Sequence, residues 1–195
     1  MSHVKTDKLS ARTASGTITL GESGETLTVP SGVTLTNNGT ASGFGKVLQV
    51  VQATKSDTFS TTSGSFIEVT GLSVSITPLS ASNNVLIIYS AAFGSSNLSH
   101  HQLRRDGVEI APLNSDAGYF SGWSCGEVND VNWMGMANVA YLDSPSSTSS
   151  LTYSVYCKAR NSSFITSVNR STADTSSVDY SIRGASYIIA MEIAG

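Results

Sequence analysis

Charged residues are scarce in this sequence. They make up 13% of its 195 residues, about half of the roughly 25% that is usual in soluble proteins, and the formal net charge is -3. Such a chain has no basic field that could neutralise a phosphate backbone, so nucleic acid is not expected as a partner. A phosphate-binding loop is missing as well. The nearest match, TASGFGKV at 40–47, has Thr40 where the motif needs its first glycine and Val47 where it needs Ser or Thr.

Long apolar runs are also absent. No run approaches the roughly 18 residues that a membrane-spanning helix requires, and the opening MSHVKTDKLS lacks the apolar core of a signal peptide. We therefore expect a chain that is made in a cytoplasm and has no membrane as a partner. The two cysteines, Cys125 and Cys157, are too far apart for a metal-binding spacing. In a reducing compartment both are expected to be free and buried.

A complete catalytic signature is not found either. GWSCG at 122–126 fits the G-x-S-x-G pattern, which needs a strand before it, a helix after it, and an acid and then a histidine downstream. The following residues have no helical periodicity, and every histidine precedes Ser124. A catalytic triad in the chain order His, Asp, Ser, made of His100, Asp106 or Asp116, and Ser124, stays open, because triads are recognised by geometry and not by sequence order. We interpret the chain as not an enzyme, with no catalytic residue, no metal and no cofactor.

What the sequence does contain is the two-residue period of half-buried strands. LTYSVYCKA at 151–159 places Leu151, Tyr153, Val155, Cys157 and Ala159 on one face. Asp106-Gly107 lies between two further runs, which is a strong hairpin signal. The other expected strands are 47–54, 65–71, 72–78, 85–93, 133–142 and 186–193. With no long helical pattern, these strands predict an all-β fold, an antiparallel β-sandwich or jelly roll, over residues 46–195.

Residues 1–45 have a different character. Residues 1–12 are charged with few apolar partners, which is typical of an extended arm. Short alternating runs then follow, separated by Gly-Glu-Ser-Gly, Pro-Ser-Gly and Asn-Asn-Gly turn signals; they are 17–20, 26–29 and 33–36. Such short strands cannot form a stable core alone. The segment therefore packs on the following domain, or identical copies associate through it.

Several phrases resemble a known family. VKTDKLSARTASGTITLGESGETLTVPSGVTLTNNGTASGFG resembles the N-terminal segment of tail-fibre-like virion proteins of bacteriophages. KVLQVVQATKSDTFSTT, GLSVSITPLSASNNVLI, YLDSPSSTSSLTYSV and SYIIAMEIAG are similar to the C-terminal β-domain of the same group, in the same order along the chain. The resemblance implies a homotrimer with an N-terminal shaft or docking segment and a jelly-roll head whose copies pack around a threefold axis.

The same resemblance implies a function. We expect a virion structural protein, assembled in the host cytoplasm, that forms a trimeric fibre or spike on the tail. Its arm would dock onto other virion proteins, and its head would face a glycan or protein of the host surface. The docking residues are expected to be Val4, Lys5, Lys8, Leu9 and Arg12. The alternative, favoured by the short chain, is a capsid decoration protein or head fibre that stabilises the shell or adheres weakly to cells.

Loop residues of a sandwich are the usual places for recognition. The candidates for contact with a receptor are Arg104, Arg105 and Asp106 at the hairpin, Arg160, Asn161, Asn169 and Arg170 near another turn, and Trp123 and Trp133 in the aromatic-rich stretch 119–136. Trp and Tyr offer large apolar faces with a polar handle. Solvated turns use the same polar residues, and aromatic side chains also serve core packing and subunit contacts, so those interpretations stay open.

The adjacent histidines need a separate interpretation. His100 and His101 lie on one expected strand, so their side chains point to opposite faces and cannot chelate one ion together. A trimer could still bring three copies of one histidine to its axis. Ordinary surface or interface histidines are the alternative.

Overall fold

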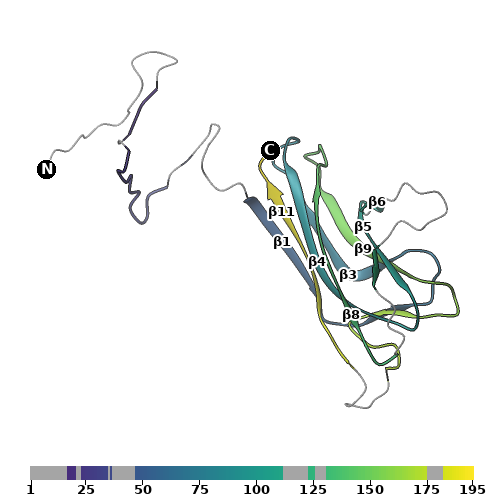
Figure 1. Ribbon diagram of the computed structural model, residues 1–195. Helices are drawn as coiled ribbons and strands as arrows, with labels where there is room; N and C mark the ends of the chain where they lie inside the picture. Colours follow the sequence, from purple (N-terminus) through teal and green to yellow (C-terminus); the bar gives the residue numbers. More distant parts are fainter. Residues whose placement is uncertain are drawn as a thin grey trace. The chain divides into compact units, whose positions relative to one another are not determined.

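The chain forms two separate units, Met1–Phe44 and Gly45–Gly195. The computed structural model describes residues 17–20, 23–34, 36, 47–111, 131–174 and 182–195, and the backbone of 123–125. In the second unit the described residues form antiparallel strands and no helix (Figure 1). The predicted all-β class is confirmed.

The first sheet is built around β4 (Asn84–Ser95). β11 (Ser186–Ile193) and β8 (Gly135–Asp143) pair with opposite edges of β4, because residues 85–90 pair with both of them. β1 (Val47–Lys55) pairs with β11. The short β10 (Thr166–Val168) follows β11 along β4, and β2 (Phe59–Thr61) pairs with β10.

The second sheet is built around β5 (Ser99–Arg105) and β9 (Leu151–Ala159), which pair along their lengths. β3 (Ile67–Ile76) lies on the other edge of β9. β6 (Val108–Ala111) and β7 (Trp123–Cys125) share the other edge of β5. The two strands expected at 65–71 and 72–78 are instead the single strand β3. Gly71 has a positive φ of 82° there, and the register with β9 shifts at this irregularity.

The strand order is that of a jelly roll. Leaving aside the short β2 and β10 and counting β6 with β7 as one strand, eight strands remain; numbered 1 to 8 along the chain, they lie in the orders 1-8-3-6 and 2-7-4-5. The inner faces of both sheets form one core, whose largest buried side chains are Tyr89, Tyr153, Phe93, Leu72, Ile87, Leu103 and Ile188. Cys157 is free and buried among them, as the alternation of 151–159 predicted.

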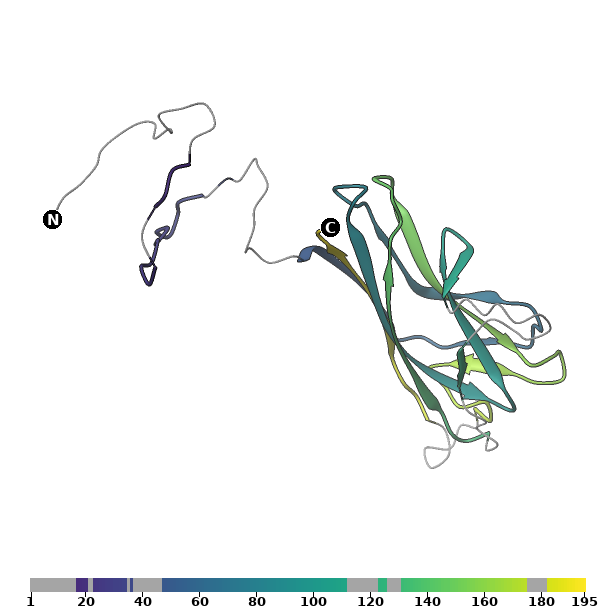
Figure 2. The same cartoon turned by 45° about the horizontal axis from the view of Figure 1, so that its top comes forward.

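The sandwich has two ends, which we name by the direction of β1. At the near end β1 begins at Val47, beside Ile193 close to the C-terminus, and the links 77–83 and 144–150 join the sheets (Figure 2). At the far end β1 finishes at Lys55, and the β4–β5 and β9–β10 links cross there. The N-terminal unit is therefore joined to the sandwich at the near end.

The described part of the N-terminal unit contains turns but no strand. Turns lie at Ser23-Gly24 and Ser31-Gly32, where both glycines have positive φ, so these two turn signals are confirmed. The short strands expected at 17–20, 26–29 and 33–36 are not formed among the described residues, because an extended run needs a partner strand for its backbone hydrogen bonds. Its large apolar side chains are exposed: Ile18, Leu20, Leu27, Val29 and Val33.

Candidate functional site

The β5–β6 hairpin has the predicted turn. Asp106 and Gly107 have φ values of 50° and 81°, as a two-residue type I′ turn requires. The Asp106 amide donates to the Thr152 carbonyl at 2.8 Å, and the Thr152 amide donates to Asp106 Oδ1 at 2.8 Å. Asp106 therefore anchors the hairpin to the start of β9 at the near end.

Arg105 connects the two sheets. Its Nη1 donates to Asp143 Oδ2 at 2.6 Å, and the Tyr153 hydroxyl donates to the same oxygen at 2.7 Å. Burial, and then the bond to Asp143, raises the pKa of Tyr153, so its hydroxyl stays protonated. Because Asp143 is buried at the end of β8, this group fixes β8 against β5 and β9.

Arg104 lies on the outer face of the second sheet. Its guanidinium is 4.4 Å from the ring centroid of Tyr156 and 5.6 Å from that of Phe66, distances at which cation–π attraction operates. Nη2 and Nε donate to Gln102 Oε1 at 2.9 and 3.1 Å, and the Tyr156 hydroxyl donates to Glu68 at 3.2 Å. The outer face of the second sheet is therefore polar, charged and aromatic.

Arg170 belongs to an ion-pair group at the far end. Its Nη1 is 2.7 Å from Asp174 Oδ2, and Arg183 Nη2 donates to Asp174 Oδ1. Arg170 and Arg183 also face each other across an isolated antiparallel bridge. One carboxylate between two guanidiniums leaves one excess positive charge, and the Arg183 side chain is 52% exposed.

Trp133 lies in the link before β8, and 62% of its surface is exposed. Residues of that link contact the ion-pair region, because the Val131 carbonyl accepts bonds from the Ala173 amide and the Thr172 hydroxyl. Val131 and Ile182 are exposed as well. We call this group the far-end cluster: Val131, Trp133, Arg170, Asp174, Ile182 and Arg183. It combines an exposed aromatic side chain with a partly exposed cation.

Arg160 and Asn161 are exposed at the far end, in the link after β9. Arg160 Nη1 donates to Asn97 Oδ1 at 3.3 Å, and its guanidinium is 5.9 Å from the Phe164 ring centroid. Asn161 accepts bonds from the amides of Ser163 and Phe164, so it shapes the turn. The predicted recognition residues are thus divided: Trp133, Arg160, Asn161 and Arg170 lie at the far end, and the Arg104–Asp106 hairpin lies on the second sheet towards the near end.

β7 places Ser124 within a strand. Its backbone is opposite His100, and Trp123 is opposite His101. A nucleophile elbow needs a sharp turn from a strand into a helix, and the backbone of residues 123–125 does not have that form. Asp116 and the expected docking residues Val4, Lys5, Lys8, Leu9 and Arg12 lie outside the described residues.

The two histidines occupy opposite faces of β5, as predicted. His101 is buried in the core, and burial, followed by the charge of His100, lowers its pKa to about 4. His100 is half-buried, and burial followed by the charge of Lys158 lowers its pKa as well. Within the described ranges, no three His, Cys, Asp or Glu side chains gather in a way that could hold a metal ion.

Asp174 and Arg183 were missed by sequence reasoning. Both are single charged residues in Ser- and Thr-rich text, and Arg183 meets Asp174 only through the backbone bridge to Arg170. The four-residue spacing between Arg170 and Asp174 was the one available signal, but outside a helix that spacing predicts no contact.

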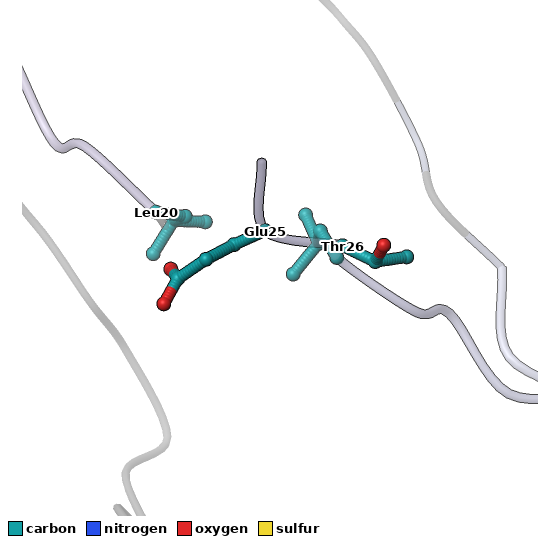
Figure 3. A pocket seen from close by; sticks show the side chains of 4 residues that line it. Leu20, Glu25 and Thr26 are labelled. Atoms are coloured by element: carbon teal, nitrogen blue, oxygen red, sulfur yellow. The ribbon is translucent and has the colours of Figure 1, made fainter. Parts of the chain in front are cut away.

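The N-terminal unit presents a shallow hollow around the Ser23-Gly24 turn. It is lined by Leu20 on one side of the turn and by Glu25, Thr26 and Leu27 on the other (Figure 3). Two of these four side chains are apolar and exposed. The hollow is therefore part of the unburied apolar surface of this unit.

No protein-family model matches the chain, and no curated protein matches it either. Among the residues that the structure describes, none forms a helix long and apolar enough to cross a membrane.

Proposed function

We propose that this chain is a structural protein of a bacteriophage virion: a homotrimeric fibre or spike on the tail. The N-terminal arm would dock onto other virion proteins, and the β-sandwich would adhere to a glycan or protein of the host surface. The sequence resemblance to tail-fibre-like proteins is the basis for proposing a virion structural protein. The distribution of side chains on the sandwich supports the proposed adhesion to the host surface.

The observation that carries the adhesion proposal is the difference between the two ends of the sandwich. The chain joins the sandwich at the near end, where β1 begins. The far-end cluster, with Trp133 and Arg183 exposed, lies at the opposite end. Trp and Arg are the residue types most enriched in the side chains that dominate binding energy. The adhesive surface would thus lie at the end of the sandwich opposite to the one where the chain enters it.

The N-terminal unit supports association of several copies. Its described apolar side chains are exposed, and it forms no sheet among those residues. Burial of exposed apolar side chains between identical copies stabilises an assembly of those copies. Light scattering on the purified protein should therefore give three times the chain mass of 20.3 kDa. A monomer would remove the physical argument for a fibre.

Adhesion is tested by binding of the labelled protein to intact host cells. Trp133→Ala and Arg183→Ala should each weaken binding by about tenfold or more, the effect of removing a dominant contact. Leu79→Ala is the matched control, because Leu79 is exposed at the near end and should bind like the parent. Unchanged binding of a Trp133→Ala/Arg183→Ala double variant contradicts adhesion through the far end.

Docking is tested separately. Deletion of residues 1–15 should abolish incorporation into particles while the sandwich stays folded, and normal incorporation contradicts the docking role. Locating the protein on intact particles distinguishes the tail proposal from the capsid alternative. A ring near the portal supports the tail, and a pattern over the whole lattice supports capsid decoration.

A further inference from the structure

The outer face of the first sheet carries two rows of mostly apolar side chains that cross all four of its main strands. Cross-strand partners share a face, so the register defines rows of neighbouring side chains. One row runs Val50, Met191, Leu86, Leu142 from β1 to β8. Val50 and Leu142, at the edges of this row, are 55% and 53% exposed. Because more than half of each of these two apolar side chains is exposed, no other part of the sandwich covers the edges of this row.

The next row continues the same surface. It runs Gln52, Ile189, Ile88, Ala140, again from β1 to β8. Gln52 and Ala140 are exposed at its edges, and the two isoleucines between them are half-buried. On the far-end side the next row holds the polar Thr54, Ser90 and Asn138 beside the exposed Tyr187, and Met136 on β8 is exposed beyond it. We call this surface, built on the outward-facing residues of β1, β11, β4 and β8, the apolar face.

No residue in these two rows carries a charge. The outer face of the second sheet differs, since it holds Glu68, Arg104 and Lys158. Burying a charge without a partner costs several kcal/mol by the usual order of magnitude. The apolar face can therefore be covered without that cost, whereas the outer face of the second sheet cannot.

The apolar face is large enough for a protein contact. Strands lie about 4.8 Å apart and alternate residues about 6.8 Å apart, so four strands and the three rows that cross them span roughly 14 by 14 Å between outermost Cα atoms. With its side chains this area suits the centre of a standard interface, which covers about 800 Å² on each partner. Large exposed apolar patches mark interaction sites in proteins.

We propose that the apolar face packs against a second copy of this chain, so that heads as well as N-terminal segments hold the assembly together. The inference rests on the proposed trimer and names a surface that contributes to it. In a trimer the three equivalent faces would meet around the threefold axis, and because each is uncharged, no chain buries a charge in the contact. Any other partner would have to bring such a surface of its own.

The test combines a deletion with matched charge substitutions. Residues 45–195 form a separate unit that contains the whole described core, so a chain lacking residues 1–44 isolates association of the heads. Val50→Lys with Leu142→Lys places two cations on the apolar face. Val108→Lys with Leu79→Lys is the control, because these residues are 68% and 72% exposed outside that face and the chemical changes are the same.

Sedimentation equilibrium of the shortened chain should show self-association. The variant on the apolar face should associate at least about tenfold more weakly, because each cation must be desolvated in the contact. The control should associate like the parent. Near-UV circular dichroism checks that both variants are folded. If the double variant does not fold, Met136→Lys, at another exposed position of the apolar face, replaces it under the same criterion.

The outcomes separate the inference from the proposed function. A shortened chain that is monomeric while the full chain is trimeric overturns the inference and leaves the trimeric fibre intact, because the N-terminal segment then makes the trimer. A monomeric full chain overturns the proposed trimer. If the control substitutions weaken association as much as those on the apolar face, the inference is also overturned, because association then does not depend on the apolar face.

Discussion

At the scale of single residues, His101 is a base that is buried in the core. Its Nδ1 lies 2.8 Å from the Tyr89 hydroxyl, and its ring stacks on Phe93 with the centroids 5.0 Å apart. Burial lowers its pKa to about 4, with a smaller contribution from His100. In an unfolded chain the same imidazole has a pKa near 6.5. The folded protein therefore binds this proton less readily than the unfolded chain does.

We predict that stability falls as the pH drops from about 6.5 to about 4. The unfolded state takes up the proton first, so the free energy of unfolding decreases by up to about 1.4 kcal/mol per pH unit, about 3 kcal/mol in all as an order of magnitude. Above pH 6.5 this contribution is constant. Urea denaturation of the parent and of His101→Phe across this range measures it. His101→Phe should give a clearly shallower decline.

His100→Gln is the comparison for that experiment. His100 is only half-buried, so its substitution should flatten the profile less than His101→Phe does. A decline that is equally steep in the parent and in His101→Phe contradicts the assignment. The pH dependence would then come from carboxylates, which lose stabilising charge at lower pH.

At the scale of elements, buried polar side chains fasten strands that are distant in sequence. At the near end the Glu192 carboxylate on β11 accepts bonds from Gln49 Nε2 at 2.6 Å, the Leu79 amide at 2.7 Å and Asn83 Nδ2 at 2.6 Å. Burial alone would raise the pKa of Glu192, but the bonds from Asn83, Gln49 and Leu79 lower it. An ionised Glu192 thus connects β1, β11 and the 77–83 link.

Asn169 has the corresponding role at the far end. It is fully buried, with a left-handed φ of 61°, which Asn tolerates better than most residues. Its Nδ2 donates to the carbonyls of Lys55 and Asp57 at 2.8 and 2.9 Å, and its Oδ1 accepts from Ser186 at 2.6 Å. One side chain therefore joins β1, β10 and β11, and Asn169 is not available for recognition.

We predict that Asn169→Ala destabilises the sandwich by about 2–5 kcal/mol, because it leaves buried carbonyls without a donor and because alanine tolerates the left-handed region less well than asparagine. Chemical denaturation measures the change. Asn161→Ala is the matched control: Asn161 is exposed and holds only its own turn, so the loss should stay within about 1 kcal/mol. Equal losses in both variants contradict the role of Asn169. Asn169→Gly, which tolerates the same φ, separates the backbone effect from the lost bonds.

At the scale of the whole molecule, the two units differ in how much apolar surface they bury. The sandwich has its own core, drawn from both sheets within residues 45–195. The described apolar side chains of the first unit are exposed. The sandwich therefore needs no residue of the first unit to complete its core.

We predict that removing residues 1–44 leaves the sandwich folded, with one cooperative unfolding transition and unchanged near-UV circular dichroism. The physical reason is that hydrophobic burial, the main stabilising contribution, lies within the retained residues. Thermal unfolding at a fixed protein concentration measures this, because self-association raises apparent stability by mass action. A shortened chain that exposes its core, detected by dye binding, contradicts the prediction.

Much of the fold could be predicted from local sequence. The strands at 151–159 and 186–193 have the predicted bounds, and the Asp106-Gly107 hairpin forms as expected. Two-residue alternation and turn residues depend on neighbours in the chain, so they can be read without knowing the fold. The N-terminal runs have the alternation of strands but form none among the described residues, because no partner strand is supplied.

The sequence by itself determined that this is an all-β chain with a thin N-terminal segment, because alternation, turn signals and run length are local properties. Only the tertiary structure decided which surfaces are exposed. In SYIIAMEI the buried face of β11 includes Ser186 and Glu192 while the outer face is the more apolar one, so alternation could not tell that Ile188 enters the core while Ile189 belongs to the apolar face. Likewise, Arg183 meets Asp174 only because a backbone bridge brings their segments together. Such contacts depend on how distant segments pack, and no local pattern encodes that packing.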